Sequence, residues 1–136
     1  TESGYRNPCA QDDALRELST PLIPISDTVL IMPLIGAIDS RRAQQIIEAL
    51  LGGVAENRAE TVIIDITGVP IVDTHVADTL VRAARAVGLL GAQAILSGIR
   101  PEIAQTLVGL GIDLGKLVTM ATLQRGVAYA LAHQGR

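Results

Sequence analysis

The chain has 136 residues, of which 49% are hydrophobic and 18% charged, with a net charge of −3. This length and composition predict one globular domain with a buried core. Because the chain has no Trp or Phe and only two Tyr, the core must be aliphatic. The acidic balance and the scarcity of aromatic rings argue against nucleic-acid binding, which uses clustered cations and stacking platforms.

Membrane insertion and secretion are not expected either. No apolar run reaches the roughly 20 residues that a membrane-spanning helix needs. The first residues are polar and lack the apolar segment of a signal peptide, and the single Cys9 cannot form a disulfide framework. We therefore expect a cytoplasmic protein without a membrane partner.

The chain divides into a short polar lead-in and one domain. Residues 1–19 are interpreted as this lead-in, including the end of a linker helix, which Pro21 terminates. Residues 20–136 are predicted to form the domain. Apolar runs predict strands at 22–25, 28–35, 61–66, 92–96 and 117–120, with a tight turn at 26–27.

Between these strands the apolar spacing changes to that of helices. It predicts helices that open at Arg41 and His75, one over 101–110, and a last one over 122–132 with Leu123, Val127 and Leu131 facing inward. The order is strand, strand, helix, strand, helix, strand, helix, a short strand and a helix. Connections of this kind predict an α/β fold with a mixed sheet of four to five strands.

One arrangement occurs twice: an apolar strand, an Asp, a hydroxyl residue and a helix start. The first pair is Asp39-Ser40 and the second is Asp73-Thr74, which His75 follows. A helix start has unpaired N–H groups and the positive end of the helix dipole. Either member of each pair could cap its helix, and a phosphate on the hydroxyl would also be stabilised there. Two such elements in one domain indicate a phosphorylation switch.

Other candidate sites are weaker. Asp65 lies in an apolar strand, where a phospho-acceptor or metal-binding role is possible but a structural or loop-orienting role is favoured. The glycine-rich segments lack the spacing of phosphate-binding loops, and His75 and His133 have no partner at metal-ligand spacing. We expect no catalytic residue, cofactor or metal, and hence no enzyme; Asp65 and Asp73 as paired carboxylates are the remaining enzymatic alternative.

Long segments of the chain resemble the STAS family, the sulfate-transporter and anti-sigma-antagonist domains, and most closely the RsbR-type scaffolds of the bacterial stressosome. The resemblance runs from about residue 15 to the C-terminus. It is carried by residues 18–25, 32–40, 64–74 and 98–106. It implies a STAS-like single α/β domain.

The resemblance also implies a function. Such a domain is a non-enzymatic signalling scaffold that sequesters a serine/threonine switch kinase and is phosphorylated by it, which releases the kinase. The acceptors correspond to Ser40 and Thr74, flanked by Asp39, Asp73 and His75. Ser40 is a mild departure, since Thr is frequent at the first position. The implied partners are this kinase, copies of the chain and a paralogous STAS protein.

Two alternatives stay open. A simple anti-sigma-factor antagonist would be switched mainly at Thr74 and would be a small species rather than a large assembly. A ligand- or nucleotide-binding STAS module would bind a nucleotide, although the chain lacks a phosphate-binding loop.

Overall fold

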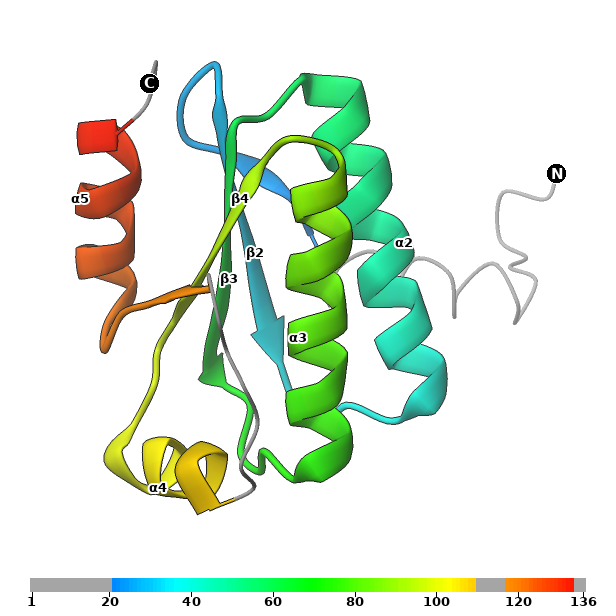
Figure 1. The fold of residues 1–136 in the computed structure, drawn as a ribbon, viewed down its shortest axis with the longest axis vertical. Helices are drawn as coiled ribbons and strands as arrows, with labels where there is room; N and C mark the ends of the chain where they lie inside the picture. Colours follow the sequence, from blue (N-terminus) through cyan, green and yellow to red (C-terminus); the bar gives the residue numbers. More distant parts are fainter. Residues whose placement is uncertain (1–20, 110–116, 134–136) are drawn as a thin grey trace, which may run out of the picture.

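The computed structural model describes residues 21–109 and 117–133. Within these ranges a five-stranded sheet is combined with helices that connect or follow its strands (Figure 1). The strands are β1 (Ile23–Pro24), β2 (Val29–Ile35), β3 (Thr61–Gly68), β4 (Gln93–Ser97) and β5 (Val118–Thr119). The helices are α2 (Ser40–Asn57), α3 (Thr74–Leu89), α4 (Pro101–Gly109) and α5 (Leu123–His133). The predicted α/β class with a mixed sheet is confirmed.

The strands lie in the order β1-β2-β3-β4-β5. β1 pairs antiparallel with β2, and the remaining neighbours are parallel. Pro24 lies in the edge strand, where its missing N–H costs no sheet hydrogen bond. β3 is central, and its first residues, 61–66, are all buried. This explains their continuous apolar sequence, because a parallel strand is covered on both faces.

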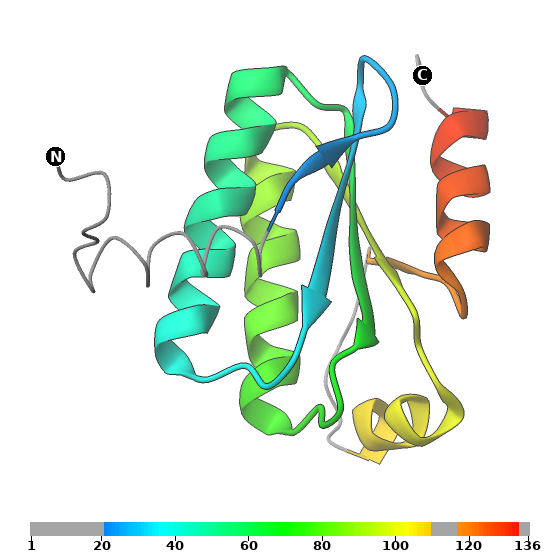
Figure 2. The same ribbon diagram turned by 180° about the vertical axis from the view of Figure 1, so that it is seen from behind.

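The two faces of the sheet are covered unequally. Helices α2 and α3 lie side by side on one face and α5 on the other, with α4 at one end (Figures 1 and 2). The larger apolar cluster lies under α2 and α3 and includes Ile46, Leu50 and Leu80. A smaller cluster around Ile63 and Ile95 lies under α5. No helix in the described ranges is long and apolar enough to cross a membrane.

Several predicted bounds differ from the structure. The turn between the first two strands spans residues 25–28 rather than 26–27, and Ile25 N–H donates to Val29 O at 2.9 Å. Leu131 is 40% exposed, so its predicted inward position is wrong. The N-terminal lead-in and the end of the third predicted helix lie outside the described residues.

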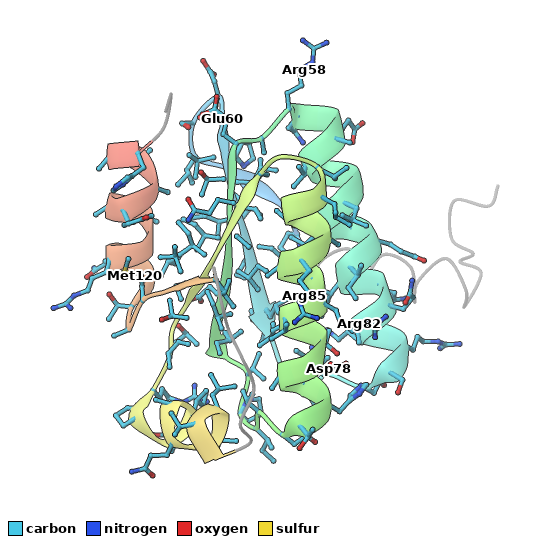
Figure 3. The ribbon with its side chains drawn as sticks, viewed as in Figure 1. Arg58, Glu60, Asp78, Arg82, Arg85 and Met120 are labelled. Carbon is cyan, nitrogen blue, oxygen red and sulfur yellow. The ribbon has the colours of Figure 1, made fainter. Side chains whose placement is uncertain are left out.

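The parallel strands place the functional elements at one edge of the sheet. The carboxyl ends of β2, β3 and β4 meet there, and α2, α3 and α4 begin just beyond them (Figure 1). Arg58 and Glu60 mark the opposite end of the molecule (Figure 3). Both predicted Asp-hydroxyl pairs therefore lie at the same edge.

Candidate functional site at two helix starts

The two aspartates cap their helices in nearly the same way. Asp39 has φ −97° and ψ −178°, and its carboxylate accepts from Arg42 N–H at 2.8 Å. Asp73 has φ −98° and ψ −172° and accepts from Val76 N–H at 2.9 Å. Extended backbone and a side-chain acceptor for the third helical N–H define an N-cap. The choice that the sequence left open is thus resolved in favour of the Asp in both pairs.

The two hydroxyl residues are therefore not needed as caps. Ser40 and Thr74 are the first residues of their helices, and each is exposed. Neither hydroxyl makes a hydrogen bond to any other residue in the described ranges. His75 is also exposed. Both hydroxyls are thus accessible to a modifying enzyme.

The two strands that lead to these helices are tied together at their ends. Gly36 N–H donates to Gly68 O at 2.9 Å, and Ile35 is the register partner of Gly68. A Cβ at Gly68 would lie 3.0 Å from Leu34 O, closer than side chains normally approach. This close approach fixes the start of both loops at neighbouring points of the sheet.

The loop before α2 is held by a residue of its own helix. Arg42 donates from Nη1 to Ala37 O at 2.8 Å, and the side chain of Ile38, in the same loop, is buried. Burial lowers the pKa of Arg42, an effect that the nearby Asp39 carboxylate opposes. The guanidinium stays charged at neutral pH, since its pKa starts far above 7.

The loop before α3 is held from a different part of the chain. Arg100, just before α4, donates from Nη1 to Thr67 O at 2.7 Å and from Nη2 to Val69 O at 2.6 Å. Its Nε pairs with Glu102 at 3.0 Å. The side chains of Val69 and Val72 are buried. The loop that leads to Thr74 is thus anchored by the burial of its two valines and by hydrogen bonds from Arg100.

Asp65 has the structural role that the sequence favoured. It is 7% exposed, and its Oδ1 accepts from Thr67 Oγ1 and from Ser97 Oγ, each at 2.9 Å. These bonds satisfy a buried carboxylate that would otherwise be costly. They also join the ends of β3 and β4. Asp73 is engaged as a cap, so the geometry does not favour a pair of catalytic carboxylates.

Sequence reasoning missed the residues that join β3 to β4 and α4. Gly98 has φ +81°, and a Cβ there would lie 2.6 Å from Thr67 N and 2.8 Å from Asp65 Oδ1. Ser97 and Arg100 are likewise remote in sequence from the residues they bind. The local sequence indicates a turn, because Gly98 precedes Arg100-Pro101. It does not indicate which residues Ser97 and Arg100 bind.

Two exposed apolar side chains lie in the segments that lead to α2 and α3. Ile35, at the end of β2, is 63% exposed, and Ile71, in the loop before α3, is 70% exposed. Exposed apolar side chains at the rim of a site can contact a docked protein. In the described ranges no group of three or more His, Cys, Asp or Glu side chains could hold a metal ion.

Comparison with known proteins identifies the family. The model of the STAS domain matches residues 20–125. The chain belongs to the STAS domain family. It is 55% identical over 121 residues to the RsbT co-antagonist protein RsbRA of Bacillus subtilis (strain 168), an alignment that covers 89% of this chain and 44% of that protein. The predicted resemblance to the RsbR type is confirmed.

Solved structures agree with this STAS assignment. A serine-to-glutamate variant of RsbS from Moorella thermoacetica matches with a TM-score of 0.72 and 28% identity, covering 83% of this chain and 95% of that one. A second match is a chain of a structure described as the molecular architecture of the stressosome, "a signal integration and transduction hub". It has a TM-score of 0.65 and 29% identity, and the match covers 84% of this chain and 100% of that one. This STAS chain spans less than half the length of RsbRA.

Proposed function

We propose that this STAS domain is a non-enzymatic scaffold of a stressosome-type complex that holds a serine/threonine switch kinase and releases it when phosphorylated at Ser40 and Thr74. One observation carries the proposal: two exposed helix-start hydroxyls at one edge of the sheet, each beside an Asp that already caps the helix. The 55% identity to an RsbT co-antagonist supports it. The partner would be the RsbT counterpart in this chain's organism.

The modification is a phosphoryl transfer from ATP. The oxygen of each hydroxyl attacks the γ-phosphorus, the bond from that phosphorus to the β-phosphate oxygen breaks, and ADP leaves. The hydroxyl proton passes to a base of the kinase. Each helix start presents N–H groups and a dipole that stabilise the product phosphate. The neighbouring Asp39 or Asp73 opposes this locally, so the main effect falls on the docked partner.

Release follows from charge and desolvation. Each phosphate adds about −1.5 to −2 charges at neutral pH. Both phosphates would lie at the starts of α2 and α3, and the segments that lead to these helices expose Ile35 and Ile71, two apolar side chains that we expect to contact the kinase. Burying a dianion in such an interface without a matched cation is strongly unfavourable. Phosphorylation therefore weakens kinase docking.

Assembly with other STAS domains is the second part of the proposal. The match to a stressosome chain supports packing with copies of this chain and with a paralogous STAS protein. A simple antagonist would instead remain a small species. Sedimentation of the chain with its paralogue distinguishes the two, because the scaffold is expected in a large particle.

The cytoplasmic location stays a prediction.

The test is retention of the kinase on the immobilised domain. In the absence of ATP the kinase should bind wild type and the double variant Ser40→Ala, Thr74→Ala equally. With ATP and Mg²⁺, wild type should release it and the double variant should retain it.

Thr122→Ala is the matched control: Thr122 Oγ1 accepts from Arg125 N–H at 3.2 Å at the start of α5, on the other face of the sheet. This control should release the kinase as wild type does. Equal release from the double variant would refute the proposal.

A further inference from the structure

The loop before α3 depends on a residue that is more than thirty positions away. Arg100 bridges the carbonyls of Thr67 and Val69 with two guanidinium nitrogens, at 2.7 and 2.6 Å. A guanidinium presents its donors in a planar fork, so it can bind both carbonyls at once. Hydrogen bonds from a charged donor are also shorter and stronger than neutral ones. The loop backbone is thereby fixed just before the residues that lead to Thr74.

The position of Arg100 is itself fixed by the end of β4. Ser97 is fully buried and donates to Asp65 at 2.9 Å. Gly98 then follows with φ +81°, a conformation that other residues adopt only at a cost. Without a Cβ, its backbone can approach Thr67 and Asp65. This turn brings Arg100 next to the carbonyls that it binds.

The loop before α2 does not share this support. The guanidinium of Arg100 binds Thr67, Val69 and Glu102 among the described residues. The loop that leads to Ser40 is instead held by Arg42 through Ala37 O. A hydrogen bond from Gly36 N–H to Gly68 O joins the segments that lead into the two loops, and it lies at the strand ends rather than at Arg100.

We propose that Arg100 is a positioning residue for one of the two acceptors: it holds the β3–α3 loop and so positions Thr74 for the kinase, whereas the position of Ser40 does not depend on Arg100. This inference rests on the proposed function. The rate of phosphorylation could then be changed separately at the two hydroxyls: at Ser40 through its own helix, and at Thr74 through Arg100 just before α4. Any partner that displaces Arg100 would slow phosphorylation of Thr74 alone.

The first arm of the test needs no kinase. Amide hydrogen exchange is measured by mass spectrometry on the wild-type chain and on Arg100→Ala, comparing peptides over 66–76 with peptides over 34–43. In the variant, amide exchange should be faster than in wild type over 66–76 and unchanged over 34–43. Unchanged exchange in both segments would overturn the structural part of the inference, whatever the outcome for the kinase.

The second arm measures phosphorylation at each site with ATP and the cognate kinase. In Arg100→Ala the labelling rate at Thr74 should fall about tenfold, because phosphoryl transfer is sensitive to displacements of about one ångström. The rate at Ser40 should stay within about twofold, as expected for an independently supported site. Since Ser40 is on the same chain, it reports whether the variant is folded and able to dock.

Two further variants test what Arg100 contributes. Arg100→Lys keeps the charge but cannot span both carbonyls, so it should restore the Thr74 rate only in part. Arg82→Ala removes an exposed arginine from α3 (Figure 3) and should leave both rates unchanged. Equal rates at Thr74 in wild type, Arg100→Ala and Arg100→Lys, or full recovery with Lys, would overturn the inference. Absence of label at both sites in wild type would instead refute the proposed function.

Discussion

The starts of α2 and α3 are alike in their caps and different in their supports. Asp39 and Asp73 make the same N-cap bond at 2.8 and 2.9 Å. The loop before α2 is braced by Arg42 from the next turn of chain, whereas the loop before α3 is braced by Arg100 from another element. The cap is a local property of the sequence, and the position of the loop is a property of the fold. Two hydroxyls with the same local chemistry can therefore respond differently to a change elsewhere.

The largest expected difference is between two glycines: Gly36, in the loop before α2, and Gly98, in the turn between β4 and α4 that brings Arg100 to the loop before α3. Gly36 and Gly98 have φ of +84° and +81°. Among the described residues, a Cβ at Gly36 would have only Arg42 Nη1 within 4 Å, at 3.6 Å, but at Gly98 it would lie 2.6 Å from Thr67 N. Gly98→Ala should lower the free energy of unfolding by about 3 kcal/mol and Gly36→Ala by about 1 kcal/mol. Urea unfolding followed by circular dichroism measures both, and equal losses would contradict the crowding at Gly98.

The buried carboxylate of Asp65 gives the next effect. Asp65→Ala leaves the hydroxyls of Thr67 and Ser97 without their acceptor, and Ser97 has no access to water. We expect a loss of about 2 kcal/mol in the free energy of unfolding. Asp78→Ala, an exposed position on α3 (Figure 3), is the control and should change stability by less than about 0.5 kcal/mol. An unchanged free energy of unfolding in Asp65→Ala would show that the hydrogen bonds of Asp65 do not stabilise this edge of the sheet.

The two caps should be equivalent. Asp39→Ala and Asp73→Ala each remove one bond to a helix N–H, and each should cost about 1 kcal/mol. Thermal or urea unfolding of the two variants provides the comparison. A cost confined to one variant would mean that the matching cap geometry does not correspond to matching energetics, and that the helix starts differ in more than their loop supports.

The smallest effect is expected at the ion pair beside Arg100. Glu102 lies 3.0 Å from Arg100 Nε, with 31% of the Arg100 side chain and 69% of the Glu102 side chain exposed. Glu102→Gln should change the free energy of unfolding by less than about 0.5 kcal/mol and leave the loop bonds of Arg100 intact. Hydrogen exchange over 66–76 should match wild type. Faster exchange in this variant would mean that Glu102 is needed to orient the guanidinium.

The sequence was informative where the determinants are local. Apolar spacing predicted the α/β order, and the Asp-hydroxyl pairs predicted both helix starts within one residue, because capping depends on neighbouring residues. It could not decide between Asp39 and Ser40 as the cap, since both types are good caps. Only the structure shows that the Asp carboxylate accepts the bond and that Ser40 and Thr74 are exposed.

Tertiary support could not be predicted in the same way. The bonds from Arg100 to Thr67 and Val69 span more than thirty residues, and no periodicity signals such a pair. The role of Asp65 was anticipated in kind, because a buried carboxylate needs partners, but Ser97 as a partner follows only from the register of β3 and β4. Exposure of Ile71 likewise depends on how its loop is folded.

The most direct test of the central claim is peptide-resolved mass spectrometry of the wild-type chain after incubation with ATP, Mg²⁺ and the cognate kinase. The account predicts phosphate on both Ser40 and Thr74, and on no other hydroxyl of the domain. Phosphate on Thr74 alone would contradict the two-site scaffold and favour a simple antagonist. No phosphate at either residue, under conditions in which the paralogous STAS protein is labelled, would contradict the account of both helix starts.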